Sequence, residues 1–188
     1  MITYKYLDAD LEKIQAELSD YLSNLDIYQL GFTKLPIEEI LNTSKTLKDW
    51  FKSLNCMPTS SYMIKTQVGS SKENAHVDNW IENPIWNKSS VSKYLLAINV
   101  PVKNTEGTYT DFYEYIDGPV KNMEFERHDI TYRYYGKANL KEIDRYSLSK
   151  PVVLNTTIPH SVINNTDKDR FVLTFRFEKD PWHLFYYD

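Results

Sequence analysis

Residues 150–177 read KPVVLNTTIPHSVINNTDKDRFVLTFRF, and this stretch decides the fold. It predicts two short strands, a polar turn and a long final strand, because apolar and polar residues alternate from Arg170 onward. In the final strand one row consists of Phe171, Leu173, Phe175 and Phe177, and the other of Arg170, Val172, Thr174 and Arg176. A period of two places these rows on opposite faces. The aromatic row must therefore be buried, and the arginine row must face a different environment on the other side of the strand.

The N-terminal part of the chain predicts helices. Apolar residues at helical spacing favour one helix that begins at Asp8 or Asp10 and ends near residue 25. Residues 30–35 predict a short strand. A second apolar stripe covers residues 37–54 and predicts one helix or two. The polar residues just before Ser44 interrupt the stripe and favour two helices, with Ser44 as the candidate N-cap of the second helix.

Short strands and turns follow from residue 58, while residues 138–143 favour a helical turn. Roughly eight short strands behind two or three helices predict a mainly β protein with N-terminal helices, either a β-sandwich or a jelly roll. No linker divides the chain, so we expect a single domain over residues 1–188. Its parts are N-terminal helical padding over 1–58, a jelly-roll core over 59–178 and an aromatic tail over 179–188.

Composition narrows the class of protein. The 188 residues are 41% hydrophobic and 26% charged, which suits one globular domain with its own core. A single cysteine and the lack of a secretory signal or apolar span predict a cytoplasmic protein that does not enter membranes. A net charge of −4 without basic runs disfavours nucleic acid as the partner. Composition leaves the oligomeric state open.

Four residues suggest chemistry. His76 and Asp78 form a His-x-Asp pair after a glycine turn, and His160 precedes Arg170 in the closing stretch. Two histidines and one carboxylate can bind a metal on one face and leave positions open, the arrangement of non-haem Fe(II) oxygenases. An arginine near the second histidine can hold a dicarboxylate co-substrate through paired hydrogen bonds.

Each of these residues also fits an ordinary structural role. His76 beside Asp78 also fits a surface histidine next to a turn, and Arg170 also fits a simple ion pair with Asp167 or Asp169. The order of the parts and their strand context favour the metal site. The next candidate cluster consists of Glu126, His128 and Asp129.

The segments AHVDNW, PVVLNTTIPHSVINNT and DRFVLTFRF together resemble the Fe(II)/2-oxoglutarate-dependent dioxygenase superfamily, over about residues 60–178. The LAINVPV strand and the PHSVIN segment are similar to the aspartyl/asparaginyl β-hydroxylase-like branch, and the final strand to prolyl hydroxylases. The resemblance implies a double-stranded β-helix (jelly roll, cupin-like) with the metal inside one end. It implies His76, Asp78 and His160 as iron ligands and catalytic centre, and Arg170 as the residue that binds the distal carboxylate of 2-oxoglutarate.

Other residues are candidates for the co-substrate site. Arg176 shares the row of Arg170, and in the nucleic-acid demethylase branch two arginines at that spacing both touch the co-substrate. Because six residues of strand span about 20 Å, we expect Arg176 deeper in the barrel or near its opposite mouth. Its ordinary role there would be a structural ion pair. Family members complete the carboxylate site with a residue from a neighbouring strand. The candidates here are Tyr62, Lys65, Gln67 and Asn99.

The resemblance implies hydroxylation of an unactivated C–H bond, with Fe(II) as cofactor, consumption of 2-oxoglutarate and O2, and release of succinate and CO2. Demethylation and desaturation stay open as other outcomes. The substrate is unidentified, with a protein side chain or a small molecule favoured. Residues 79–92, which include Trp80 and Trp86, predict either a substrate lid or an anchored irregular loop.

Two competing hypotheses remain. One is a catalytically silent jelly-roll module for binding or assembly, in which the aromatic tail docks on a partner or a second copy. The other keeps a cupin-like barrel with a different metal and no 2-oxoglutarate. Arg170 speaks against the second.

Overall fold

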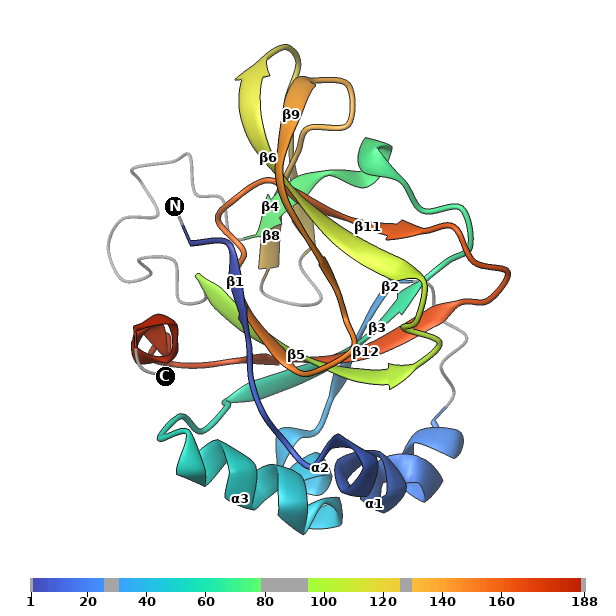
Figure 1. Ribbon diagram of the computed structural model, residues 1–188, viewed down its shortest axis with the longest axis vertical. Helices are drawn as coiled ribbons and strands as arrows, with labels where there is room; N and C mark the ends of the chain where they lie inside the picture. Colours follow the sequence, from blue (N-terminus) through green and yellow to red (C-terminus); the bar gives the residue numbers. More distant parts are fainter. Residues whose placement is uncertain (1, 26–30, 79–94, 126–129, 187–188) are drawn as a thin grey trace.

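The computed structural model describes residues 2–25, 31–78, 95–125 and 130–186. Within these residues the chain forms twelve strands in two six-stranded sheets, and every pairing is antiparallel. Three helices lie along the outer side of one sheet (Figure 1). The predicted mainly β jelly roll with N-terminal helices is confirmed.

The major sheet has the order β1-β10-β5-β12-β3-β2. Its strands are β1 (Tyr4–Tyr6), β10 (Val152–Asn155), β5 (Leu96–Lys103), β12 (Arg170–Arg176), β3 (Ser60–Thr66) and β2 (Gly31–Leu35). The predicted closing strand, β12, pairs on both sides, so that Thr174 lies opposite Tyr62 on β3 and Asn99 on β5. Paired residues in an antiparallel sheet point to the same face. These three side chains therefore share the inner face with the arginine row.

The minor sheet has the order β7-β8-β4-β11-β6-β9. Its strands are β7 (Lys121–Phe125), β8 (Ile130–Tyr134), β4 (His76–Asp78), β11 (His160–Asn164), β6 (Thr108–Asp117) and β9 (Asn139–Ser147). β11 lies between β4 and β6, with His160 opposite both His76 and Phe112. The register thus brings the two predicted histidine ligands side by side.

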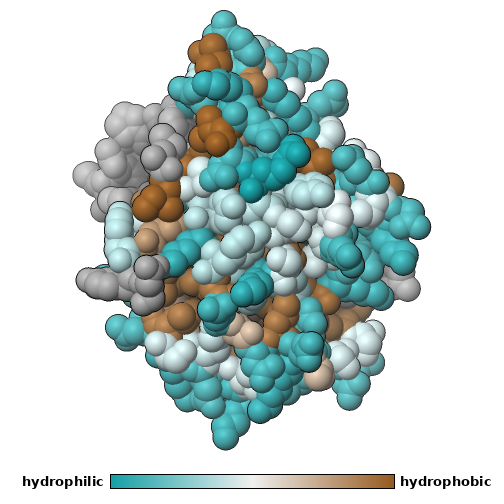
Figure 2. Space-filling model, in the orientation of Figure 1, coloured by the Kyte–Doolittle hydropathy of each residue, from teal (hydrophilic) through white to brown (hydrophobic). Residues whose placement is uncertain are grey.

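The helices are α1 (Leu11–Ser23), α2 (Ile37–Thr43) and α3 (Lys45–Ser53). The Ser44 hydroxyl accepts the backbone N–H of Leu47 at 3.1 Å, which confirms Ser44 as the cap of the second helix in this region. Figure 2 shows a mainly hydrophilic surface over the helices, as expected when their apolar stripes face the sheet. Phe51 of α3 contacts Phe175 and Phe177, with ring centroids 4.9 and 6.1 Å apart. The predicted aromatic row therefore packs under the helices, with Phe171 partly buried and the other three residues buried.

The other face of β12 enters a separate core between the two sheets. Val172 packs there with Phe112 of β6 and Tyr146 of β9. Arg170 and Arg176 share this face, and each is only 2% exposed. The sequence thus places hydrocarbon on one side of β12 and two buried guanidinium groups on the other.

Three predictions about elements need correction. Residues 139–143 belong to strand β9 and not to a helical turn, because pairing with β6 puts Leu140 opposite Tyr115 and overrides local helix propensity. Residues 1–58 are more than helical padding, since they supply the two edge strands of the major sheet. Strand β2 confirms the short strand predicted over residues 30–35, whereas β1 was not predicted. The strands are also more numerous than the eight or so predicted.

The C-terminal segment forms a 3-10 turn, η4 (Trp182–Phe185). Leu184 and Phe185 are buried in the core beneath the helices, whereas Trp182 and Tyr186 are exposed. Most of the described tail therefore belongs to the fold, which weakens the case for it as a docking segment. Among the helices of the described segments, none combines the length and apolar character needed to cross a bilayer.

Candidate metal centre

The predicted His76, Asp78 and His160 side chains converge at one point. His76 and Asp78 are the first and third residues of β4, so strand alternation places them on one face. His160 begins the neighbouring strand β11. One ligand atom from each of the three residues lies within 4.8 Å of the others, and they form a group that could hold a metal ion. The sequence prediction brought together the same three residues.

Backbone carbonyls orient both imidazole rings in the same way. Nδ1 of His76 lies 2.8 Å from the carbonyl oxygen of Asn74, and Nδ1 of His160 lies 2.9 Å from that of Ile158. A carbonyl only accepts hydrogen bonds, so each Nδ1 carries the proton and each Nε2 keeps its lone pair. Metal-binding histidines ordinarily donate the N–H of the ring nitrogen that does not bind the metal to a carbonyl or carboxylate in this way. Both rings are thus arranged to offer Nε2 to a cation.

The protonation states also suit a metal. Burial, and then the electrostatic interaction with the neighbouring His76, lower the pKa of His160 to about 4, so its ring is neutral at pH 7. Burial alone would raise the pKa of Asp78, but Arg176, His160 and His76 outweigh it and hold that pKa below its ordinary value. A neutral imidazole and an ionised carboxylate are the forms that bind a divalent cation.

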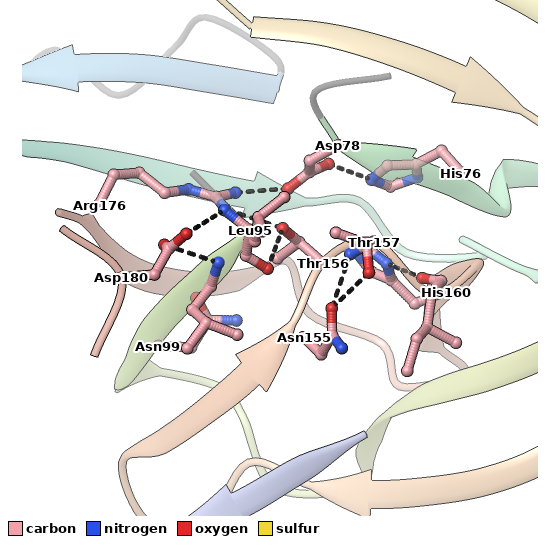
Figure 3. A network of polar contacts seen from close by, with 12 residues as sticks. His76, Asp78, Leu95, Asn99, Asn155, Thr156, Thr157, His160, Arg176 and Asp180 are labelled. Carbon is pink, nitrogen blue, oxygen red and sulfur yellow. Dashed lines mark hydrogen bonds and ion pairs between the residues drawn. The ribbon is translucent and has the colours of Figure 1, made fainter. Parts of the chain in front are cut away.

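Arg176 holds one oxygen of Asp78 and leaves the other toward the histidines (Figure 3). Its Nη2 lies 2.5 Å from Oδ2 of Asp78, and both side chains are buried. Oδ1 of Asp78 lies 3.4 Å from Nε2 of His76 and has no hydrogen-bond partner in the described residues. A buried carboxylate oxygen without a partner is costly unless something else occupies its lone pairs. The three donors therefore fit a metal ion bound through one oxygen and two nitrogens.

The position predicted for Arg176 is wrong, whereas the structural ion pair predicted as its ordinary role is confirmed. We expected Arg176 deeper in the barrel or near the opposite mouth, and it lies instead beside Asp78 at the metal end. Its Nη1 also donates to the Thr156 hydroxyl at 3.3 Å, while the Thr156 carbonyl accepts the backbone N–H of Asp78 at 3.0 Å. Thr156, which sequence reasoning missed, thus ties β4 to the segment before β11. The sequence offers no signal for such a backbone contact.

Arg170 lies at the other end of β12 in different surroundings. It is buried, and within residues 2–25, 31–78, 95–125 and 130–186 it makes no ion pair with an acidic side chain. Burial lowers the pKa of its guanidinium, and the Tyr146 hydroxyl partly offsets that effect. The ordinary reading, an ion pair with Asp169, is wrong because Asp169 pairs with Lys65 at 3.0 Å. Asp167 likewise makes no ion pair with it.

A polar row lines the interior between the two arginines. Asn99 donates to the Tyr146 hydroxyl at 3.5 Å, but its own Oδ1 and the Thr174 hydroxyl have no hydrogen-bond partner among the described residues. Tyr62 shares this row. Unpaired buried acceptors and donors of this kind point to a polar ligand or water.

The other two candidates do not lie in this row. Lys65 sits opposite Phe171, on the outer face, and Gln67 is exposed beyond the end of β3. Tyr146 was missed because the start of its strand was predicted as a helical turn. Tyr146 and Leu148 alternate with the polar residues Arg145, Ser147 and Ser149, and this period of two is the signal that could have found it.

Tyr134 of β8 borders the more exposed side of the cluster. It lies opposite His76 in the sheet, with ring centroids 5.6 Å apart. Burial and then the charge of Asp78 raise the pKa of its phenol. Trp80, Trp86 and the cluster of Glu126, His128 and Asp129 lie outside the described residues.

Comparisons with known proteins add little. No protein-family model matches the chain, and no curated protein sequence matches it. Among solved structures, AviO1 from Streptomyces viridochromogenes Tue57 aligns over 95% of this chain and 90% of that one, with 10% identity and a TM-score of 0.45.

Proposed function

We propose that this protein is an Fe(II)- and 2-oxoglutarate-dependent oxygenase. In this proposal it hydroxylates an unactivated C–H bond of a protein side chain or a small molecule and releases succinate and CO2. Two features support it, the convergence of two histidines and one carboxylate, and a buried arginine without an acidic partner in the described chain. The buried arginine is the observation that supports 2-oxoglutarate as the co-substrate.

The metal would be held by Nε2 of His76, Nε2 of His160 and Oδ1 of Asp78. When bound, it supplies open coordination positions and the redox chemistry of the oxidation. The protein's own contribution is orientation. Two carbonyls fix the imidazole tautomers, and Arg176 holds Oδ2 of Asp78 so that Oδ1 faces the ligand cluster.

Arg170 would bind the distal carboxylate of 2-oxoglutarate. A buried guanidinium without a counter-charge is strongly unfavourable, so its place in the interior indicates an anionic partner that binds there. Arg176 is less suited because its charge is already paired with Asp78. The rings of Phe112 and Tyr146 link the two ends of the site. The ring centroid of Phe112 lies 5.9 Å from that of His160 and 6.0 Å from that of Tyr146. Tyr146 in turn neighbours Arg170.

The first experiment measures metal and co-substrate together. Purified without oxygen, the protein should bind one equivalent of Fe(II), with Mn(II), Co(II) or Ni(II) as substitutes. With oxygen it should convert 2-oxoglutarate slowly to succinate, measured by NMR. His76→Ala and His160→Ala should lose the metal, and Asp78→Ala should lose turnover. His183→Ala is the matched control, because the His183 ring contacts the Leu54 carbonyl and is not one of the three clustered donors.

Each part of the proposal can fail separately. Unchanged metal content in His76→Ala and His160→Ala would rule out the ligand assignment and leave His128 as the next candidate. Metal binding without any effect of 2-oxoglutarate would favour a cupin-like protein of another kind. A chain that binds neither would be a silent jelly-roll module.

A further inference from the structure

Gly136, in the turn between β8 and β9, is in unusually close contact with the segment before His76. A Cβ atom at this position would lie 2.2 Å from the carbonyl oxygen and 3.1 Å from the carbonyl carbon of Glu73. Real Cβ atoms essentially never approach another atom so closely. The backbone of Gly136 does not have a positive φ, unlike Gly69, Gly107 and Gly118. Glycine is therefore required here for space and not for backbone conformation.

The contact lies directly beside the group that orients His76. Glu73 is the middle residue of the 3-10 turn η1 (Lys72–Asn74), and the next carbonyl, that of Asn74, holds Nδ1 of His76 at 2.8 Å. On the other side of the same junction, the backbone N–H of Tyr135 donates to the Ala75 carbonyl at 2.8 Å. The hydrogen bond between Tyr135 and Ala75 thus holds the turn before β4 in contact with Gly136.

We propose that Gly136 is a positioning residue for His76. Without a side chain, it lets the Glu73 peptide pack against the β8–β9 turn, and this packing aims the Asn74 carbonyl at Nδ1 of His76. A methyl group at 136 would have to displace the Glu73 carbonyl by roughly 1 Å to reach van der Waals separation. The Asn74 carbonyl would move with it, and His76 would lose the bond that fixes its tautomer. The inference rests on the proposed role of His76 as a metal ligand.

The test compares Gly136→Ala with Gly69→Ala. Gly69 lies in the same segment before His76 and has φ +80°, but a Cβ there meets nothing within 4 Å. Gly69→Ala therefore introduces backbone strain without touching Glu73. Apparent Co(II) affinity, measured by calorimetry at 20 °C, should fall about 10- to 100-fold in Gly136→Ala, the usual effect of losing a contact that orients a ligand. Gly69→Ala should lower the melting temperature and leave the affinity unchanged.

A second readout needs no metal. Long-range proton–nitrogen NMR spectra of the metal-free protein report the tautomer of each imidazole. Wild type should show His76 and His160 protonated at Nδ1. In Gly136→Ala the His76 pattern should become a mixture, while His160, held by Ile158, should stay as it is. A folded Gly136→Ala protein with the wild-type His76 tautomer and the wild-type Co(II) affinity would overturn the inference.

A further variant covers the case in which Gly136→Ala does not fold. Asn74→Gly keeps the carbonyl but loosens the backbone that carries it. It should give partial tautomer mixing at His76 and a smaller loss of Co(II) affinity, and an unchanged tautomer would equally count against the inference. Wild-type protein that binds no Co(II) at all would instead contradict the proposed function.

Discussion

Arg170 and Arg176 lie on the same face of one strand, yet their neighbours separate their roles. Arg176 is paired with Asp78, and its charge is used within the protein. Arg170 is buried to the same degree, but no carboxylate within the described part of the chain neutralises it. The sequence identified both arginines, but it could not identify the partner of either. That depends on the packing of β4 against the end of β12.

Arg170→Ala and Arg176→Ala should therefore weaken the binding of different ligands. Loss of a buried bidentate partner costs about 2–5 kcal/mol, so Arg170→Ala should raise the apparent 2-oxoglutarate constant at least about 30-fold. Arg176→Ala should mainly weaken metal binding, about 10- to 100-fold, because Asp78 loses its orienting contact. Titrations of metal, and of 2-oxoglutarate at saturating Mn(II), separate the two effects. If Arg176→Ala loses the co-substrate and Arg170→Ala keeps it, the assignment is reversed.

His160 should make the stability of the metal-free protein depend on pH. Its pKa is about 4 in the folded protein and 6.5 in a free side chain. As the pH falls below 6.5, the unfolded chain takes up the proton first, so stability is fully present above that pH and is lost toward pH 4. The loss from this one buried group is about 3 kcal/mol.

Urea unfolding with a chelator present, between pH 7 and pH 4, measures this loss. His160→Asn replaces the titrating ring with a neutral polar group of similar size. The variant should show a flatter dependence on pH than wild type in the same window. Equal slopes would mean that His160 is not buried as a neutral imidazole.

At the scale of elements, prediction succeeded where one residue pattern alone decides the outcome. The alternation from Arg170 to Phe177 predicted β12 and its two faces, and the helices do cover the phenylalanine face. Ser44 predicted the break between α2 and α3 because a capping hydroxyl is a local signal. β9 was missed because its helix-favouring residues are held in a strand by pairing with β6, a contact distant in sequence.

Strand β1 joins the two sheets next to the proposed co-substrate site. Its backbone pairs with β10 of the major sheet, while the hydroxyls of Tyr4 and Tyr6 donate to the carbonyls of Arg145 and Ser147 on β9. The Tyr4 ring also lies 4.8 Å from that of Tyr146. Sequence reasoning treated this region as padding, since three residues are too few to show a strand period.

Tyr4→Ala should therefore affect both stability and co-substrate binding. Removing this half-buried ring should cost roughly 2 kcal/mol and leave Tyr146 less constrained beside Arg170. Tyr6→Phe is the control, because it removes one exposed hydrogen bond and keeps the ring, at a cost of up to about 1 kcal/mol. Weaker 2-oxoglutarate binding is expected in Tyr4→Ala alone. Equal co-substrate constants in both variants would show that β1 has no part in the site.

Across the whole molecule, the major sheet separates two cores with different contents. The outer core, under the helices, is apolar and includes Phe51, Phe175 and the C-terminal Phe185. The inner core combines apolar residues such as Val172 with buried polar groups that have no partner in the described residues. Hydrocarbon packing therefore supports the sheet from one side, while the proposed site occupies the other.

This separation predicts that stability and binding respond to different substitutions on the same sheet. Phe51→Ala should lower the free energy of unfolding by about 3–5 kcal/mol, because a fully buried ring is lost from the outer core. The protein that remains folded should bind Co(II) and 2-oxoglutarate with wild-type constants. Val172→Ala, on the inner face of β12, should cost less stability but weaken 2-oxoglutarate binding, since it loosens the packing around Tyr146 and Arg170.

Urea unfolding and calorimetric titration at 15 °C, where even a destabilised variant stays folded, make the comparison. If Phe51→Ala weakened metal or co-substrate binding as much as Val172→Ala, the two cores would be coupled through β12. The helices would then be part of the site's support and not only a cover for the sheet.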